Sequence, residues 1–406
     1  MKFWLTFLFL TWAFISIASP YVQKAEFGGS ARHRSTAFAI GNSGYIGLGH
    51  INSGVDVEYE DFWRYDPASK SWTQIADYPE GKMYHAAAFV LNNKAYVGTG
   101  RREDGTYSVK FHAYDPTTNS WTPTADFIGL ARRGAVGFAI NGKGYVGTGQ
   151  VTTGYTVTFY EYNPSLDQWS QKANFIGTPR TSAVGFSIGN YGYLGTGETS
   201  GPSTNDFYQY DPSTNGWSQK ANIGAFGRQE AVGFALNGLG YIGTGDDFSS
   251  GNNFKDMWAY SPATNLWLPR HEFAGTARRY LVAFTIGPKA YLGTGTNGTN
   301  FKDFWMYNPA LSDLEDLLKK IDLKLYPNPA VENLTIDLSD LPSGIERNKI
   351  KFSLFSMDGK SNKKYQFEEK VLKIEVSEFP SGSYVYRFTY EGQSLRSGKL
   401  TLKHKS

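Results

Sequence analysis

The sequence has no cysteine in its 406 residues, and it carries little charge of either sign. Without cysteine the chain cannot form disulfides, thiolate metal sites, a cysteine nucleophile or a cysteine-linked lipid anchor. The 40 basic and 37 acidic residues leave a formal net charge of +3, which is close to neutral for this length. We therefore expect no nucleic-acid partner and no polybasic membrane anchor.

Long apolar runs are also missing, except at the N-terminus. There Lys2 precedes the uncharged stretch 3–17, which ends in the small-residue pattern Ser16-Ile17-Ala18. The stretch is shorter than the roughly 20 apolar residues that span a bilayer, so it predicts a signal peptide over residues 1–18 that is removed on export. The alternative is a short N-terminal anchor helix. We expect no transmembrane segment in the mature chain.

Glycine and aromatic residues are abundant instead. The sequence holds 45 glycines, 28 phenylalanines, 27 tyrosines and 10 tryptophans. Aromatic side chains favour pleated strands and glycine favours tight turns, so the composition predicts an all-β protein. The length favours more than one structural unit.

One repeat of about 50 residues organises most of the chain. Its central element is a tyrosine followed by two glycines that are separated by one residue, and it occurs six times, beginning at Tyr45, Tyr96, Tyr145, Tyr193, Tyr241 and Tyr291. A Tyr-x-Pro step follows in every copy. A tryptophan seven residues after that tyrosine ends five copies, at Trp72, Trp121, Trp169, Trp217 and Trp267.

Turn residues divide each repeat into four strands. Asn141-Gly142 lies between two apolar runs and predicts a tight hairpin, and segments such as 211–217 predict a second one. A four-stranded sheet buries both of its faces only by stacking on similar sheets, which is typical of a propeller blade. We expect the paired glycines to allow close approach of the backbones near the propeller axis.

The two ends of the repeat region complement each other. The last copy stops near Pro309 and lacks a fourth strand, whereas residues 21–32 align with residues 169–180, which include a fourth strand and the loop after it. We therefore expect the mature N-terminus to supply the outer strand of the last blade and to close the ring.

These repeats resemble the kelch family over residues 19–311, although one residue separates the glycines that are adjacent in that family. The resemblance implies a six-bladed kelch-type β-propeller. Such propellers include many binding modules, the copper radical oxidase galactose oxidase and a sialic acid mutarotase. The oxidase cofactor is a tyrosine cross-linked to cysteine, so this chain cannot form it, and we expect no cofactor.

After Pro309 the repeat ends. We interpret residues 312–322 as a linker and residues 323–406 as a small immunoglobulin-like β-sandwich, because strands such as 334–338 and 373–377 alternate apolar and polar residues. This region resembles the type A C-terminal sorting domain of the type IX secretion system. The matching positions are Tyr326, Pro327, Asn328, Pro329, Gly359, Gly382 and Lys399.

The resemblance implies that the type IX machinery carries the chain across the outer membrane of a Gram-negative bacterium. The protein would then be secreted or held on the cell surface, and the C-terminal domain would be removed. The alternative is an accessory module that binds a ligand itself.

Two positions of the repeat could carry a binding site. One is arginine in all copies but the second, at Arg32, Arg132, Arg180, Arg228 and Arg278. Such a repeated residue either bonds to carbonyl groups of the neighbouring blade or forms a ring that binds anions. Two residues later the side chains differ between copies, as Arg34, His85, Gly134, Ser182, Glu230 and Tyr280.

Unlike side chains around one channel mouth are what a ligand site needs, so Arg34, His85, Glu230 and Tyr280 are the favoured site. The polar loops after the paired glycines are a second candidate surface. The six histidines occupy different repeat positions and predict no metal site. We expect a monomeric binding module for a glycan or a protein. One alternative is a mutarotase-type enzyme in which Glu230, with His85 or an arginine, acts as an acid/base pair on an anionic sugar. Another is a structural part of a larger surface assembly that has no small ligand.

Overall fold

The computed structural model describes residues 19–51, 54, 56–247, 251–310, 324–339, 341, 347–356, 362–390 and 393–403. The expected signal peptide (1–18) and linker (312–322) lie outside the described residues. The described chain forms two compact units, with one break between Ser19 and Pro20 and the other between Pro309 and Ala310. Among these residues no helix has the length and apolar character needed to cross a bilayer.

Residues 20–309 form a β-propeller. In the described part of this unit there are six antiparallel four-stranded sheets, and each has its strands in the order first, second, third, fourth. The first strands alternate buried and half-buried residues, as expected for strands stacked between neighbouring sheets. They are β2 (Thr36–Ile40), β9 (Ala87–Leu91), β14 (Val136–Ile140), β20 (Val184–Ile188), β24 (Val232–Leu236) and β30 (Val282–Ile286).

The second strands are almost wholly buried and pair with the first strands through tight hairpins. They are β3 (Ser43–Gly47), β10 (Lys94–Gly98), β15 (Lys143–Gly147), β21 (Tyr191–Gly195), β25 (Leu239–Gly243) and β31 (Lys289–Gly293). The third strands are β6 (Phe62–Asp66), β12 (Phe111–Asp115), β18 (Phe159–Asn163), β22 (Phe207–Asp211), β28 (Met257–Ser261) and β32 (Phe304–Tyr307).

The fourth strands lie on the outside and are the most exposed. They are β7 (Ser71–Ile75), β13 (Ser120–Pro123), β19 (Gln168–Lys172), β23 (Gly216–Lys220), β29 (Leu266–Arg270) and β1 (Tyr21–Gln23). Of these, β1 comes from the N-terminus and pairs with β32, with Tyr21 opposite Tyr307. This pairing agrees with the expected closure by the N-terminal segment.

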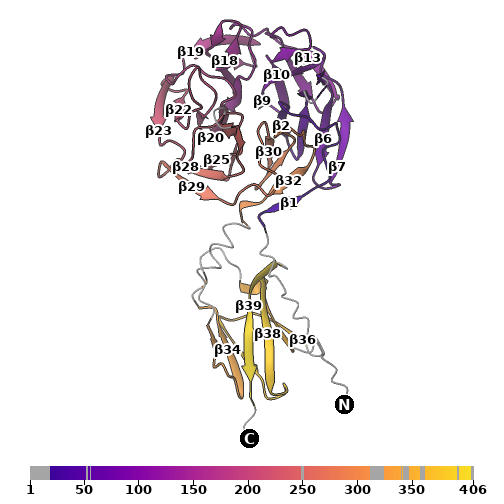
Figure 1. The fold of residues 1–406 in the computed structure, drawn as a ribbon, viewed down its shortest axis with the longest axis vertical. Coiled ribbons are helices and arrows are strands. Elements are labelled where there is room, and N and C mark those ends of the chain that lie inside the picture. The colour runs from indigo at the N-terminus through magenta and orange to yellow at the C-terminus, as the bar shows by residue number, and fades with distance from the viewer. Residues whose placement is uncertain are drawn as a thin grey trace, which may run out of the picture. The chain divides into compact units, whose positions relative to one another are not determined.

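The sheets stand around a common axis (Figure 1). Each first strand contacts the first strands of the two neighbouring sheets, and β30 contacts β2, so the innermost strands form a closed circle. The apolar cores lie between successive sheets. One of these cores lies between the first and the last sheet, where Phe27 of the N-terminal segment packs with Tyr65, Phe284 and Phe304.

The tryptophan of the repeat fastens each sheet to its neighbour. The indole nitrogen of Trp169 donates to the carbonyl of Ala125 in the preceding sheet (3.1 Å), and the same bond recurs at Trp121, Trp217 and Trp267. At the closing seam the indole nitrogen of Trp72 is buried but has no hydrogen-bond partner in the described structure. The closing seam therefore lacks a bond that four seams have, and the seam of the sheet with β1 lacks it as well, because Tyr21 stands at the tryptophan position.

The paired glycines have a different role from the one expected. They end the second strand rather than line the axis. A Cβ on Gly147 would collide with the ring of Phe159 on the third strand of the same sheet. Gly149 has a φ of +99°, and a Cβ there would lie 2.9 Å from the carbonyl oxygen of Arg133. The first glycine therefore serves packing within the sheet, and the second serves the turn that follows.

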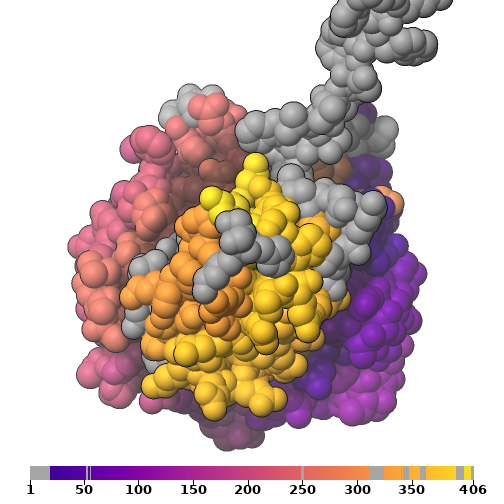
Figure 2. Space-filling model, turned by 90° about the horizontal axis from the view of Figure 1, so that it is seen from below, coloured from indigo at the N-terminus to yellow at the C-terminus, as the bar shows by residue number. Residues whose placement is uncertain are grey.

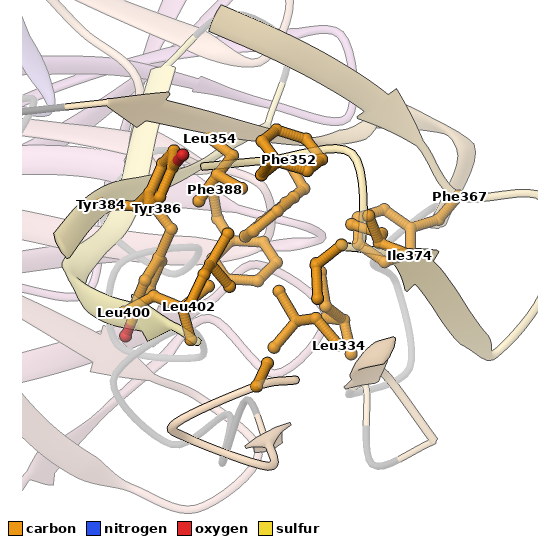
Figure 3. Packing of buried hydrophobic residues seen from close by; sticks show 14 of the residues in the cluster. Leu334, Phe352, Leu354, Phe367, Ile374, Tyr384, Tyr386, Phe388, Leu400 and Leu402 are labelled. Carbon is orange, nitrogen blue, oxygen red and sulfur yellow. The ribbon is translucent and has the colours of Figure 1, made fainter. Parts of the chain in front are cut away.

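The C-terminal unit consists of two antiparallel sheets over one apolar core (Figure 3). The three-stranded sheet holds β33 (Lys324–Tyr326), β34 (Asn333–Asp337) and β37 (Val371–Glu375), and the 3-10 helix η1 (Arg347–Lys349) leads into the second sheet. That sheet has the order β36 (Asn362–Gln366), β35 (Ile350–Ser356), β38 (Gly382–Tyr390) and β39 (Gln393–Leu402). The beginning and end of the unit, orange and yellow in Figure 2, meet where Ala330 bridges to Leu402.

Candidate functional site

One repeat position brings five different side chains and a glycine to the mouth of the propeller channel. Its residues line a cavity of about 170 Å³ and are Arg34, His85, Gly134, Ser182, Glu230 and Tyr280. All six have a left-handed backbone conformation, with φ between 52° and 60°. Backbone hydrogen bonds of 2.8–3.1 Å link the position from one sheet to the next, from His85 N–H to the Arg34 carbonyl and onward to Tyr280. This series of backbone bonds thus helps to hold five non-glycine residues in a conformation that costs energy.

Below the mouth, small residues line a second cavity of about 220 Å³ along the first strands. Ala86, Ala135, Ala183 and Ala231 form one level, and Gly137, Gly185 and Gly233 lie at the next. Polar and charged side chains are therefore concentrated at the mouth.

Glu230 is the centre of a buried network at the mouth. The hydroxyl of Tyr280 donates to Glu230, and Arg34 donates to the same tyrosine oxygen. Arg34 also contacts His50 Nε2 at 2.8 Å. Burial, and then the neighbouring Asp246, raise the pKa of Glu230 to about 8, against the lowering effect of Arg34 and Arg279. Near neutral pH this carboxyl group can therefore hold or release a proton.

Arg279 ties Glu230 to a second carboxylate. Its guanidinium lies 3.3 Å from Glu230 and 2.6 Å from Asp246. Asp246 is 1% exposed, so its charge depends on this arginine. Arg34 and Arg279 are thus both committed to partners within the protein.

Three of the six histidines meet at the mouth, although their repeat positions differ. His33 and His50 have ring centroids 4.3 Å apart, and His85 lies beside Tyr280 at 5.1 Å. Burial and the nearby Arg34 lower the pKa of His33 to about 4, and burial followed by His33 and Arg34 lowers that of His50 to about 2. The pKa of His85 is also lowered, mainly by burial. These rings are neutral at physiological pH and can bond to hydroxyl groups.

No group of three or more acidic or histidine side chains within the described residues is arranged to hold a metal ion. The histidine cluster also faces Arg34, whose positive charge opposes a cation.

The repeated arginines do not line the mouth cavity, so the expectation that Arg32, Arg132, Arg180, Arg228 and Arg278 form a ligand-binding ring is wrong. All five are at most 1% exposed. Their side chains also do not bond to carbonyl groups of the neighbouring blade. Arg180, for example, donates to the carbonyl of Thr196 (2.9 Å) and to both oxygens of Asp206 within its own sheet. They are structural clamps.

The arginine and its aspartate partner recur together in several repeats. Arg32, Arg228 and Arg278 bind Asp61, Asp256 and Asp303 in the same way. In the second repeat the arginine is replaced by Met83, and the aspartate position holds Lys110. In the third repeat Arg132 donates to the hydroxyl of Thr158. The aspartate occurs only in repeats that have the arginine. This co-occurrence is the sequence signal that could have shown the structural role of the arginines.

Two further sets of residues surround the mouth, and the sequence argument pointed to only one of them, through the polar loops after the paired glycines. One set directly precedes the mouth position, and the other directly follows the paired glycines. An isolated bridge or a short strand pair joins the two within each sheet, as with Arg133 and Gln150. One short pair joins the two sets, β8 (Met83–Tyr84) with β11 (Arg101–Arg102). The other short pairs join the second set to the loop after it: β4 (His50–Ile51) with β5 (Val57–Glu58), β16 (Gln150–Val151) with β17 (Gly154–Tyr155), and β26 (Asp246–Asp247) with β27 (Asn252–Asn253).

Comparison with known proteins agrees with this architecture. Residues 36–235 match the KLHDC2/KLHL20/DRC7 Kelch-repeats domain family, and residues 324–403 match the secretion system C-terminal sorting domain. The protein is a kelch-repeat propeller with a secretion sorting domain. A search of curated proteins gave no match.

The fold of this chain is similar to that of solved structures. "Structure of YjhT" matches with a TM-score of 0.59 at 19% identity and covers 69% of this chain and 95% of that one. Because 603 solved chains match, fold alone does not distinguish between functions.

In the sorting domain the motif residues lie on the surface. Tyr326, Pro327, Asn328 and Pro329 are exposed, as are Gly382 and Lys399, whereas Gly359 lies outside the described residues. Asn328 accepts a hydrogen bond from the backbone N–H of Thr401 at 3.1 Å. The motif therefore joins the start of the domain to its last strand.

Proposed function

We propose that this kelch propeller is an exported binding module whose channel mouth takes a glycan. The observation that carries the proposal is the convergence of Arg34, His85, Glu230 and Tyr280 on one cavity. Neutral imidazoles, tyrosine hydroxyls and a carboxyl group pair with sugar hydroxyls in both donor and acceptor roles. The cavity is smaller than the ~300–1,000 Å³ of many ligand pockets, which favours a terminal sugar unit over a long oligosaccharide.

A glycan array tests this proposal with the chain from Ser19 onward. We expect binding to a restricted set of glycans, and we expect Glu230→Gln and Arg34→Ala to reduce it. Arg64→Ala is the matched control, because Arg64 is an exposed residue of β6 away from the mouth. Uniform silence on the array would contradict a glycan ligand and would favour a protein partner.

A second candidate is an enzyme of mutarotase type. It is supported by the raised pKa of Glu230, about 8, and by the bond that Tyr280 donates to it. A protonated Glu230 could give its proton to the ring oxygen of a sugar while neutral His85 takes the proton of the anomeric hydroxyl, which opens the ring. The ring then closes with the opposite anomeric configuration.

Anomer exchange measured by NMR separates the two candidates. The enzyme predicts faster interconversion of a reducing sugar with the wild-type chain than with Glu230→Gln. Equal interconversion rates with the wild type, with the variant and in buffer alone would contradict the enzyme and favour the binding module.

The architecture and export are proposed as follows. The six sheets of residues 19–311 are the complete blades of one six-bladed ring, and residues 323–406 form an immunoglobulin-like sandwich. Residues 1–18 act as a signal peptide. The matched sorting domain supports export by the type IX machinery to the surface or medium of a Gram-negative bacterium. We propose that this domain is then removed, and that the propeller acts as a monomer.

A further inference from the structure

The seams between neighbouring sheets bring pairs of residues together at the rim of the mouth. In each seam the N–H of the second glycine donates to the carbonyl of the residue at the repeated-arginine position in the next sheet, at 2.7–2.9 Å. The two residues that directly follow these bonded groups are therefore neighbours. The six pairs are His50/Tyr84, Arg101/Arg133, Gln150/Thr181, Glu198/Gln229, Asp246/Arg279 and Thr296/His33.

Two of these pairs show that the side chains can meet. His50 stacks on Tyr84 with ring centroids 3.9 Å apart. Asp246 forms a 2.6 Å ion pair with Arg279. These two pairs combine side chains that suit one another. The same backbone geometry gives Arg101 and Arg133, two cations, neighbouring positions.

No ion pair joins Arg101 or Arg133 to a carboxylate in the part of the chain that the structure describes. Arg101 donates to the hydroxyl of Tyr84, and Arg133 Nε donates to Gln150 (2.8 Å). Both partners are neutral. Tyr107 bridges to Arg101 and has its ring centroid 5.9 Å from the Arg133 guanidinium. Arg101 and Arg133 are thus half-buried cations at neighbouring backbone positions that donate to neutral side chains, and the nearest carboxylate acting on Arg101, that of Glu58, forms no ion pair with it in the described residues.

We propose that Arg101 and Arg133 form an oxyanion subsite at the rim, which binds a carboxylate, sulfate or phosphate group of the ligand. Guanidinium groups bind such groups through paired hydrogen bonds. The inference rests on the proposed function, because it assigns an acidic glycan to the mouth. Arg34 and Arg279 do not take this role, since they already bind His50, Tyr280, Glu230 and Asp246.

The subsite lies close enough to the mouth to be part of one site. Besides burial, Arg34 and Arg133 both lower the pKa of His85, a cavity-lining residue. The repeat places Arg133 directly before Gly134, which lines the mouth cavity. A ligand in the mouth can therefore reach Arg133 with an anionic substituent.

Titration calorimetry of the chain from Ser19 onward tests the subsite at constant ionic strength. The probes are glucuronate, glucose 6-sulfate, glucose 6-phosphate, glucose and inorganic sulfate. We expect the acidic sugars to bind more tightly than glucose, and Arg133→Gln to weaken them roughly 10- to 100-fold. Arg64→Gln, which removes one exposed charge elsewhere, should leave them unchanged.

Stability provides a second readout that a merely structural role would not give. The double variant Arg101→Gln/Arg133→Gln should unfold at a higher temperature than the wild type without anions, because it removes a like-charge repulsion. Added sulfate should raise the unfolding temperature of the wild type but not of the double variant. A lower unfolding temperature for the double variant without anions would contradict the subsite.

The outcomes separate this inference from the proposed function. Equal affinity for acidic and neutral sugars, or acidic-sugar affinity that Arg133→Gln does not change, would overturn the subsite and keep the glycan site. Binding of inorganic sulfate that needs Arg133, without binding of any glycan, would keep the subsite and overturn the proposed function. No binding of any anion would overturn the subsite.

Discussion

Arg180→Met tests the structural reading of the repeated arginines. The substitution removes hydrogen bonds to Thr196 and Thr178 (2.9 Å each) and the two-oxygen contact with Asp206. Arg180 is completely buried and Asp206 has 17% side-chain exposure, so the aspartate is left as a largely buried, unpaired charge. Breaking a buried pair in this way costs about 3–5 kcal/mol. At about 2–4 °C per kcal/mol, the unfolding temperature should fall by roughly 6–20 °C.

The second repeat suggests a partner substitution, because it combines Met83 with Lys110 at the two clamp positions. Arg180→Met/Asp206→Lys should recover more than half of the lost stability, since no buried carboxylate remains unpaired. Chemical denaturation of the wild type, both single variants and the double variant gives the coupling energy. A loss below about 1 kcal/mol for Arg180→Met, or purely additive effects, would refute the clamp.

Three further predictions concern other parts of the structure. Because the pKa of Glu230 is raised in the folded chain, its contribution to stability is full below its ordinary pKa of 4.5 and is lost as pH rises through about 8. Glu230→Gln should therefore flatten this loss in urea titrations from pH 6 to 9, and an unchanged slope would count against the raised pKa. Tyr21→Ala should lower stability by about 3–5 kcal/mol through loss of the buried ring against Tyr307 and Phe273, and protection of β32 amides in hydrogen exchange should fall with it. Trp169→Phe should cost about 1 kcal/mol more than Trp72→Phe, because only Trp169 donates its indole N–H, and equal losses would speak against the seam bond.

Much of the fold could be predicted because the repeat carries its own turn and core signals. The Asn141-Gly142 turn between two apolar runs predicts the β14–β15 hairpin from the sequence alone. The pairing of β1 with β32 could be foreseen because residues 21–32 align with residues 169–180. The role of Gly147 could not be foreseen, because it depends on the position of Phe159 across the sheet.

The candidate site could be predicted only in part. The position of Arg34 and Glu230 at the mouth followed from the repeat register, because equivalent residues of stacked sheets lie around one axis. The pairs across the seams could not be read from one repeat, because Arg101 and Arg133 belong to different sheets and are joined by a bond between their neighbours. Their meeting requires the geometry of two sheets together.

The most direct test of the binding site is a crystal structure of the chain with the glycan that binds most strongly on the array. We predict that the glycan occupies the cavity lined by Arg34, His85, Glu230 and Tyr280. A glycan bound on the outer strands, with this cavity filled only by water, would contradict the proposed site.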